Sequence, residues 1–157
     1  MERIENREAL GLVREASKAQ IENSKCRVLI CAGTGCLAGG SGDIYRKKSG
    51  CHGFCEMGPL MRIEPQGILY TKVQLDDCDE IFHRTIEKGE IIRHLLFKQD
   101  GIEYQKQDEI PFYKKQTRNV LKNCGHIDAE HIQEYISTGG YQALEKALFN
   151  MKPEEVI

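Results

Sequence analysis

The sequence has no tryptophan, only four prolines and no long apolar run. Its longest strongly apolar stretch, residues 28–32, is far shorter than the ~20 residues that span a bilayer. The first six residues are charged and lack an apolar core, so they are not typical of a secretory signal. Basic residues (22) nearly balance acidic ones (24), which gives no broad electrostatic reason to bind nucleic acid or an anionic membrane. These absences predict a cytoplasmic protein without direct membrane insertion.

The chain is instead rich in cysteine, with seven in 157 residues. Hydrophobic residues make up 40% of the chain, so we expect a globular protein rather than a disordered tail. Without a secretory signal the thiols should stay reduced, which favours metal binding or catalysis over a disulfide framework. Four of the cysteines fall between residues 31 and 55, and this cluster defines the candidate site.

The four clustered cysteines form two closely spaced pairs. Cys31 and Cys36 make a C-x4-C pair, and Cys51 and Cys55 make a C-x3-C pair. Two pairs on two loops supply the four thiolates that a [2Fe-2S] or [4Fe-4S] cluster needs. Glycines surround both pairs and permit close approach of backbone N–H groups to an anionic cluster. The stretch from residue 33 to 58 cannot build an apolar core of its own, so a metal centre would help to order it.

Other interpretations of these residues remain open at this point. Zinc also takes four thiolates, although zinc knuckles usually place two residues inside the first pair rather than four. A thiol-redox enzyme would favour C-x-x-C, which is absent. We expect His52 to be a surface histidine with no part in metal binding. The basic run Arg46–Lys48 is expected to be a solvated charge run. The other three cysteines, Cys26, Cys78 and Cys124, are expected to be small buried thiols.

The hydrophobic pattern predicts mixed secondary structure. A charged helix is expected over 5–22, a buried strand over 26–31 and a hairpin over 61–73 that turns at 64–67. Asp76 or Asp77 should begin a helix that buries Cys78, Ile81, Phe82 and Ile86 and ends at Gly89.

The C-terminal third has a different pattern. Polar residues 98–109 suggest a linker. Three helices should follow: one from Pro111 to about Asn123, one capped by Asp128, and one marked by Tyr141, Leu144 and Leu148. A further helix start at Pro153 suggests that the chain is a truncated form of a larger protein.

Two sets of motifs resemble a known family. Val28–Cys36 and Gly50–Leu60 resemble the thioredoxin-like [2Fe-2S] ferredoxin domain that opens the flavin subunit of NAD(P)-linked (bifurcating) iron hydrogenases. Ile110–Gln116, Asn123–Gly125 and Tyr135–Tyr141 resemble the start of the flavin- and NADH-binding module. That module also occurs in the flavoprotein subunit of NADH:quinone oxidoreductase (complex I).

The resemblance implies an α+β fold, with a reduced thioredoxin-like ferredoxin domain followed by a small helical segment. It divides the chain into an N-terminal helix (1–24), the ferredoxin domain (25–98), and a linker with the truncated start of the flavin/NADH module (99–157). Cys31, Cys36, Cys51 and Cys55 would be the ligands of a [2Fe-2S] cluster. Only 14 residues separate Cys36 from Cys51, a shorter segment than relatives carry.

The function implied by the resemblance is one-electron relay within a multisubunit NAD(P)H-linked oxidoreductase or hydrogenase. FMN and NAD(P) would be held only by a full-length relative or a partner subunit, so this chain is not expected to turn over NADH alone. Two alternatives remain: a docking or structural module without a cluster, and a zinc-stabilised interaction domain.

Overall fold

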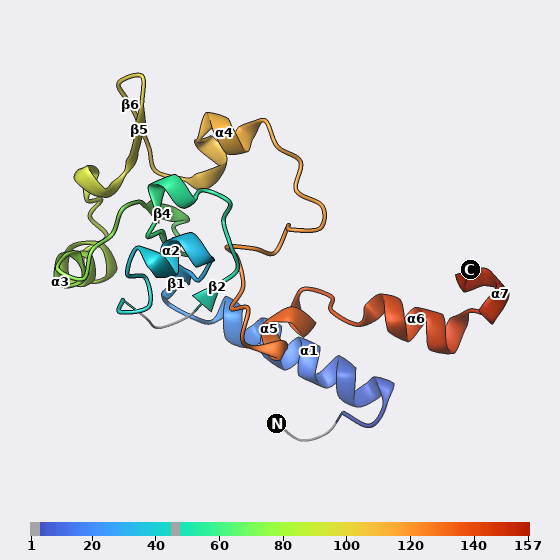
Figure 1. The fold of residues 1–157 in the computed structure, drawn as a ribbon. Helices are drawn as coiled ribbons and strands as arrows, with labels where there is room; N and C mark the ends of the chain where they lie inside the picture. Colours follow the sequence, from blue (N-terminus) through green and yellow to red (C-terminus); the bar gives the residue numbers. More distant parts are fainter. Residues whose placement is uncertain (1–3, 45–47) are drawn as a thin grey trace. The chain divides into compact units, whose positions relative to one another are not determined.

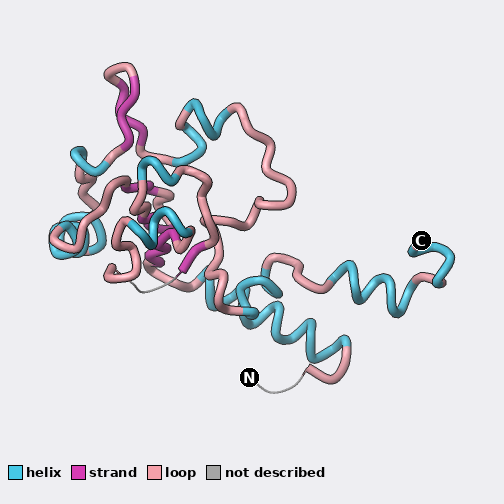
Figure 2. The backbone as a smooth tube through the Cα atoms, viewed as in Figure 1, coloured by secondary structure: helices cyan, strands magenta, loops and turns pink. Residues whose placement is uncertain are grey.

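The computed structural model describes residues 4–44 and 48–157, with only the backbone of Lys48 included. The chain divides into two compact units, Lys25–Asp128 and Met1–Ser24 with Ala129–Ile157 (Figures 1 and 2). Helices and strands are both present, as the α+β expectation requires.

A four-stranded sheet forms the centre of the unit Lys25–Asp128. Its strands are β1 (Arg27–Cys31), β2 (Lys48–Ser49), β3 (Met61–Glu64) and β4 (Ile68–Tyr70). They lie in the order β2-β1-β3-β4, with β2 parallel to β1 and the other pairs antiparallel. This order and these directions are those of a reduced thioredoxin-like sheet, which confirms the expected fold class.

Local sequence explains the two central strands and the hairpin that joins β3 to β4. The apolar run Val28–Ile30 pairs with Met61–Ile63, and most of the apolar side chains of both strands are buried. Gly67 has a φ of +72°, which a residue with a side chain adopts only at a cost, and it places the turn where the sequence predicts it. The strand and the hairpin expectations are therefore confirmed.

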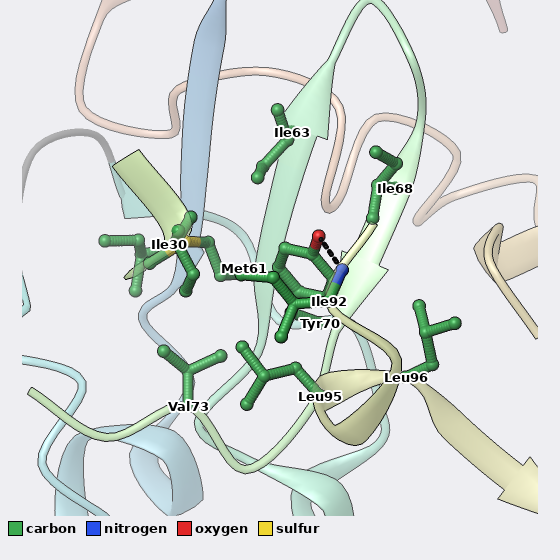
Figure 3. Packing of buried hydrophobic residues seen from close by; sticks show 10 residues of the cluster. Ile30, Met61, Ile63, Ile68, Tyr70, Val73, Ile92, Leu95 and Leu96 are labelled. Carbon is green, nitrogen blue, oxygen red and sulfur yellow. Dashed lines mark hydrogen bonds between the residues drawn. The ribbon is translucent and has the colours of Figure 1, made fainter. Parts of the chain in front are cut away.

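The main hydrophobic core includes side chains from β1, β3 and β4. Tyr70 is fully buried among Ile30, Met61, Ile92 and Leu95 (Figure 3). The backbone N–H of Ile92 donates to the Tyr70 hydroxyl at 3.1 Å. The same hydroxyl donates to Thr85 Oγ1 at 2.6 Å, because that oxygen uses its own proton on the Glu90 carbonyl.

The helix expected after Asp76 forms, but its backbone hydrogen-bonding pattern changes from α-helical to π-helical part-way along. An α-helical turn, α3 (Asp77–Glu80), continues as a π-helical segment, Ile81–Ile86, and Gly89 (φ +72°) follows its end. Ile81 is buried, whereas Phe82 is 48% exposed, so the expectation that both lie on the buried face was wrong. The wider π turn rotates later side chains away from their α-helical positions.

The segment expected to be a linker forms a second hairpin. Strands β5 (Phe97–Gln99) and β6 (Ile102–Tyr104) pair around Asp100 and Gly101. Both turn residues have positive φ (51° and 78°), as a type I′ turn requires, and Asp-Gly is a favoured sequence for that turn. The linker expectation for residues 98–109 was therefore wrong, and a 3₁₀ turn (Gln107–Glu109) follows the hairpin.

The helix expected from Pro111 to Asn123 is shorter than predicted. Helix α4 covers only Pro111–Lys114, and the chain then runs in turns to His131. Tertiary contacts override the helical pattern here, since Arg118 bonds to the backbone of a distant loop. Asp128 does not cap a helix; it is buried and its backbone bridges to Ser49.

The other unit is helical. Helix α1 (Arg7–Glu22) begins where the Asn6 side chain accepts from the Ala9 N–H, and α5 (Ile132–Ser137) packs against it (Figure 1). Helices α6 (Gln142–Asn150) and α7 (Pro153–Val156) follow, as the sequence predicts. Within the described residues, none of the helices has the length and apolar character needed to cross a membrane.

We expect Tyr70→Phe to lower the free energy of unfolding by about 1–3 kcal/mol, because the Ile92 N–H would be buried without an acceptor. Urea denaturation measures the change. Tyr104→Phe is the matched control: Tyr104 packs on Phe97, and its hydroxyl has no hydrogen bond in the described part of the chain. Equal losses in the two variants would show that the Tyr70 hydrogen bonds contribute nothing.

Candidate metal centre

The four paired cysteines lie on four successive elements at one end of the sheet. Cys31 is the last residue of β1 and Cys36 lies in the short helix α2 (Thr34–Ala38). Cys51 follows β2, and Cys55 begins a 3₁₀ turn, Cys55–Met57. All four are free thiols; Cys31 and Cys36 are buried, while Cys51 and Cys55 are exposed. The site therefore has an inner and an outer pair.

Glycines bring the two cysteine loops together. A Cβ atom at Gly33 would lie 3.0 Å from the Cys51 sulfur and 3.6 Å from the Cys31 sulfur, so sulfurs of both pairs flank one backbone position. A Cβ atom at Gly35 would lie 3.3 Å from the Cys55 sulfur, and one at Gly58 would lie 2.6 Å from the Cys36 sulfur. Larger residues at these glycines would push against the thiols.

The thiols also influence one another electrostatically. Burial and the adjacent Cys31 thiol raise the pKa of Cys36 to about 12. The charge of Cys51 raises the pKa of Cys55. Four thiolates in this arrangement would repel one another, and bound metal ions would remove that repulsion.

Backbone N–H groups point at two of the sulfurs. The Gly53 N–H donates to Cys51 Sγ at 3.3 Å, and the Leu60 backbone bonds to the Cys36 thiol and lowers its pKa, against the larger effect of burial. Hydrogen bonds of this kind stabilise metal-bound thiolates and help to set the reduction potential of iron–sulfur clusters. They agree with the expectation that glycine-rich loops allow close backbone approach.

The four thiols form two adjacent pairs in the structure, Cys31 with Cys36 and Cys51 with Cys55. Across residues 4–44 and 48–157, no three histidine, cysteine or acidic side chains surround a single point as ligands of one ion. The two pairs supply four thiols, the number that a [2Fe-2S] cluster takes, and the flanking glycines leave the space beside the sulfurs free of side chains.

His52, which lies between the outer cysteines in sequence, is buried rather than on the surface. Only 1% of it is exposed, so the expectation of a surface histidine was wrong. Burial lowers the pKa of His52 to about 4, so the ring is neutral. Nδ1–H donates to Gln107 Oε1 at 2.8 Å, because an amide oxygen can only accept, and Nε2 accepts from the Ser49 hydroxyl at 3.0 Å.

The backbone of His52 is held from the C-terminal side of the same unit. Its carbonyl oxygen accepts from the Tyr113 hydroxyl at 3.0 Å and from Arg118 Nη2 at 3.4 Å. Phe54, in the same loop, packs edge-on against the Tyr113 ring. Sequence analysis missed these supporting residues, because nothing local in residues 107–118 indicates a contact with a loop more than fifty residues earlier.

Three further cysteines lie outside the two pairs. Cys124 is partly buried, and its sulfur would be 3.0 Å from a Cβ atom at Gly50, beside the outer pair. Cys26 packs against the main core, and burial raises the pKa of both Cys26 and Cys78. Arg46, Lys47 and the side chain of Lys48 lie outside the described residues.

Comparison with known proteins identifies relatives of two kinds. The chain is 36% identical over 55 residues to the 2Fe-2S ferredoxin of Clostridium pasteurianum, an alignment covering 35% of this chain and 54% of the ferredoxin. It is 50% identical over 44 residues to the NADP-reducing hydrogenase subunit HndC of Solidesulfovibrio fructosivorans, covering 28% of this chain and 9% of that subunit. It is 52% identical over 46 residues to one subunit of the NADH-quinone oxidoreductase of Aquifex aeolicus, covering 29% of this chain and 11% of that subunit.

These similarities confirm the resemblance inferred from the motifs, to 2Fe-2S ferredoxins and to subunits of hydrogenase and NADH-quinone oxidoreductase. The chain spans about half the length of the first ferredoxin and a tenth of each larger subunit. No family model matches it. Among solved structures, the thioredoxin-like [2Fe-2S] ferredoxin from Aquifex aeolicus is similar, with a TM-score of 0.42 and 22% identity over 48% of this chain and 92% of that one.

We expect His52→Leu to destabilise the apoprotein by at least ~2 kcal/mol, because Gln107 and Ser49 would each lose a buried hydrogen-bond partner. His83→Leu is the control, since His83 is exposed and should change stability by about 0.5 kcal/mol or less. Thermal and urea unfolding of both variants provide the test. A stable His52→Leu variant would contradict the structural role given to this side chain.

Proposed function

We propose that this protein is an electron-transfer protein that holds one [2Fe-2S] cluster on Cys31, Cys36, Cys51 and Cys55. The observation that carries the proposal is the approach of sulfurs from both loops to one glycine backbone, at Gly33. Similarity to two 2Fe-2S ferredoxins supports it. Such a cluster, when bound, supplies the ability to accept and release single electrons.

The protein residues would hold, shield and orient this centre. Cys31 and Cys36 are buried with Leu60 and Tyr113, which keep water from the inner pair. Cys51 and Cys55 are exposed, so the outer pair is the side that a redox partner can approach. The Gly53 N–H fixes the Cys51 sulfur, and the His52 hydrogen bonds fix the loop between the outer ligands.

We further propose that the chain works as one component of a multisubunit NAD(P)H-linked oxidoreductase of the hydrogenase or NADH dehydrogenase type, in the cytoplasm. Its similarity to subunits of two such enzymes supports this assignment. Residues 25–98 would carry the ligands, with residues 1–24 as an N-terminal helix. Residues 99–157 would correspond to the start of a flavin/NADH-binding module, with FMN and NAD(P) on a full-length relative or a partner subunit.

Anaerobic reconstitution with iron and sulfide tests the cluster. We expect about two irons and two acid-labile sulfides per chain, with visible absorption that dithionite bleaches. Serine at any one of Cys31, Cys36, Cys51 or Cys55 should lower cluster content or shift its spectrum, because serine replaces a thiolate ligand. Cys26→Ser and Cys78→Ser are matched controls, because each removes a half-buried thiol that is not one of the four proposed ligands, and both should load like the wild type.

Two results would overturn the proposal. One zinc ion per chain, bound without sulfide, would favour a zinc-stabilised interaction domain. A protein that stays colourless after reconstitution, with no bound metal, would favour a docking or structural module.

A further inference from the structure

Arg118 brings a positive charge to the loop that carries the outer cysteines. Its Nη2 donates to the His52 carbonyl at 3.4 Å, and its guanidinium lies 5.9 Å from the centre of the Tyr113 ring. Nη1 is buried, and no acceptor bonds to it within the described residues. Arg118 as a whole is half-buried, and the buried part of a cationic group is costly unless negative charge or hydrogen bonds compensate it, so an anion beside Nη1 would be stabilised.

The described part of the chain does not pair this charge with a carboxylate, in contrast to a second arginine nearby. Arg62 also acts on His52 electrostatically, but its guanidinium is neutralised by Glu64 at 2.6 Å. The cysteines are the other source of negative charge. The Tyr113 ring under the Arg118 guanidinium packs in the same apolar cluster as Cys31 and Cys36. The His52 carbonyl that accepts from Arg118 belongs to the residue directly after Cys51, so three of the thiols lie around this charge.

We infer that Arg118 is the positive charge that complements the anionic metal centre and raises its reduction potential. This inference rests on the proposed [2Fe-2S] function. When the cluster gains one electron from an external reductant, its charge becomes one unit more negative, with no bond made or broken. A fixed cation close to the cluster stabilises that added charge, as a neighbouring cation stabilises a carboxylate over its acid.

The test is an anaerobic redox titration of reconstituted protein, followed by visible absorption and electron paramagnetic resonance. In Arg118→Gln we expect about a tenfold lower ratio of reduced to oxidised cluster at a fixed potential, equivalent to a shift of ~59 mV to more negative values. Arg118→Lys keeps the charge and should stay close to the wild-type potential.

Arg84→Gln is the matched control. It loses the same charge from the same unit, but Arg84 is 43% exposed and already paired with Glu80 and Glu90. Its potential should not move, because solvent screens an exposed charge.

Each outcome decides the inference. An unchanged potential in Arg118→Gln, or an equal shift in Arg118→Lys, would overturn it. If Arg118→Gln cannot hold a cluster while Arg118→Lys holds one at the wild-type potential, the charge is what the centre requires and the inference stands. If neither holds a cluster, Arg118 serves packing and the inference fails. Absence of a cluster from the wild type would instead refute the proposed function.

Discussion

The candidate centre depends on the buried hydrogen bonds of His52. This residue joins the end of β2, through Ser49, to the 3₁₀ turn at Gln107, and its carbonyl accepts from Tyr113 and Arg118. The outer cysteines, Cys51 and Cys55, lie on either side of His52 in sequence, and both are exposed. Together with the packing of the Phe54 ring against Phe97, Phe112 and Tyr113, these bonds determine where Cys51 and Cys55 lie.

The glycines have the complementary role of leaving space. Loops 31–36 and 51–58 approach so closely that a methyl group at Gly33, Gly35 or Gly58 would press on a cysteine. Such loops gain little from hydrophobic burial, and their conformational entropy must be offset by other contacts. Here the offset comes from the His52 hydrogen bonds on one side and from Leu60 and Tyr113 packing on the other.

Sequence reasoning succeeded where the signal is local. The apolar run of β1 and the turn at Gly67 each depend on a few neighbouring residues. The Asp100–Gly101 turn is also local, but it lies in a polar segment that resembles a linker by composition. The burial of His52 could not be predicted in this way, because its partners Gln107, Tyr113 and Arg118 are 55 to 66 residues away in sequence.

The contacts of His52 also bear on how the two sets of sequence motifs relate. A ferredoxin-like segment and the start of a subunit-like module could be independent parts joined by a linker. Instead, β5, β6, α4 and the turns that follow lie in the same compact unit as the sheet, Lys25–Asp128. Tyr113, expected to belong to the module, packs in the same apolar cluster as Cys31 and Cys36. Residues 107–118 thus help to shape the surroundings of the thiols, so an isolated 25–98 segment would have the four cysteines without the groups that bury and position them.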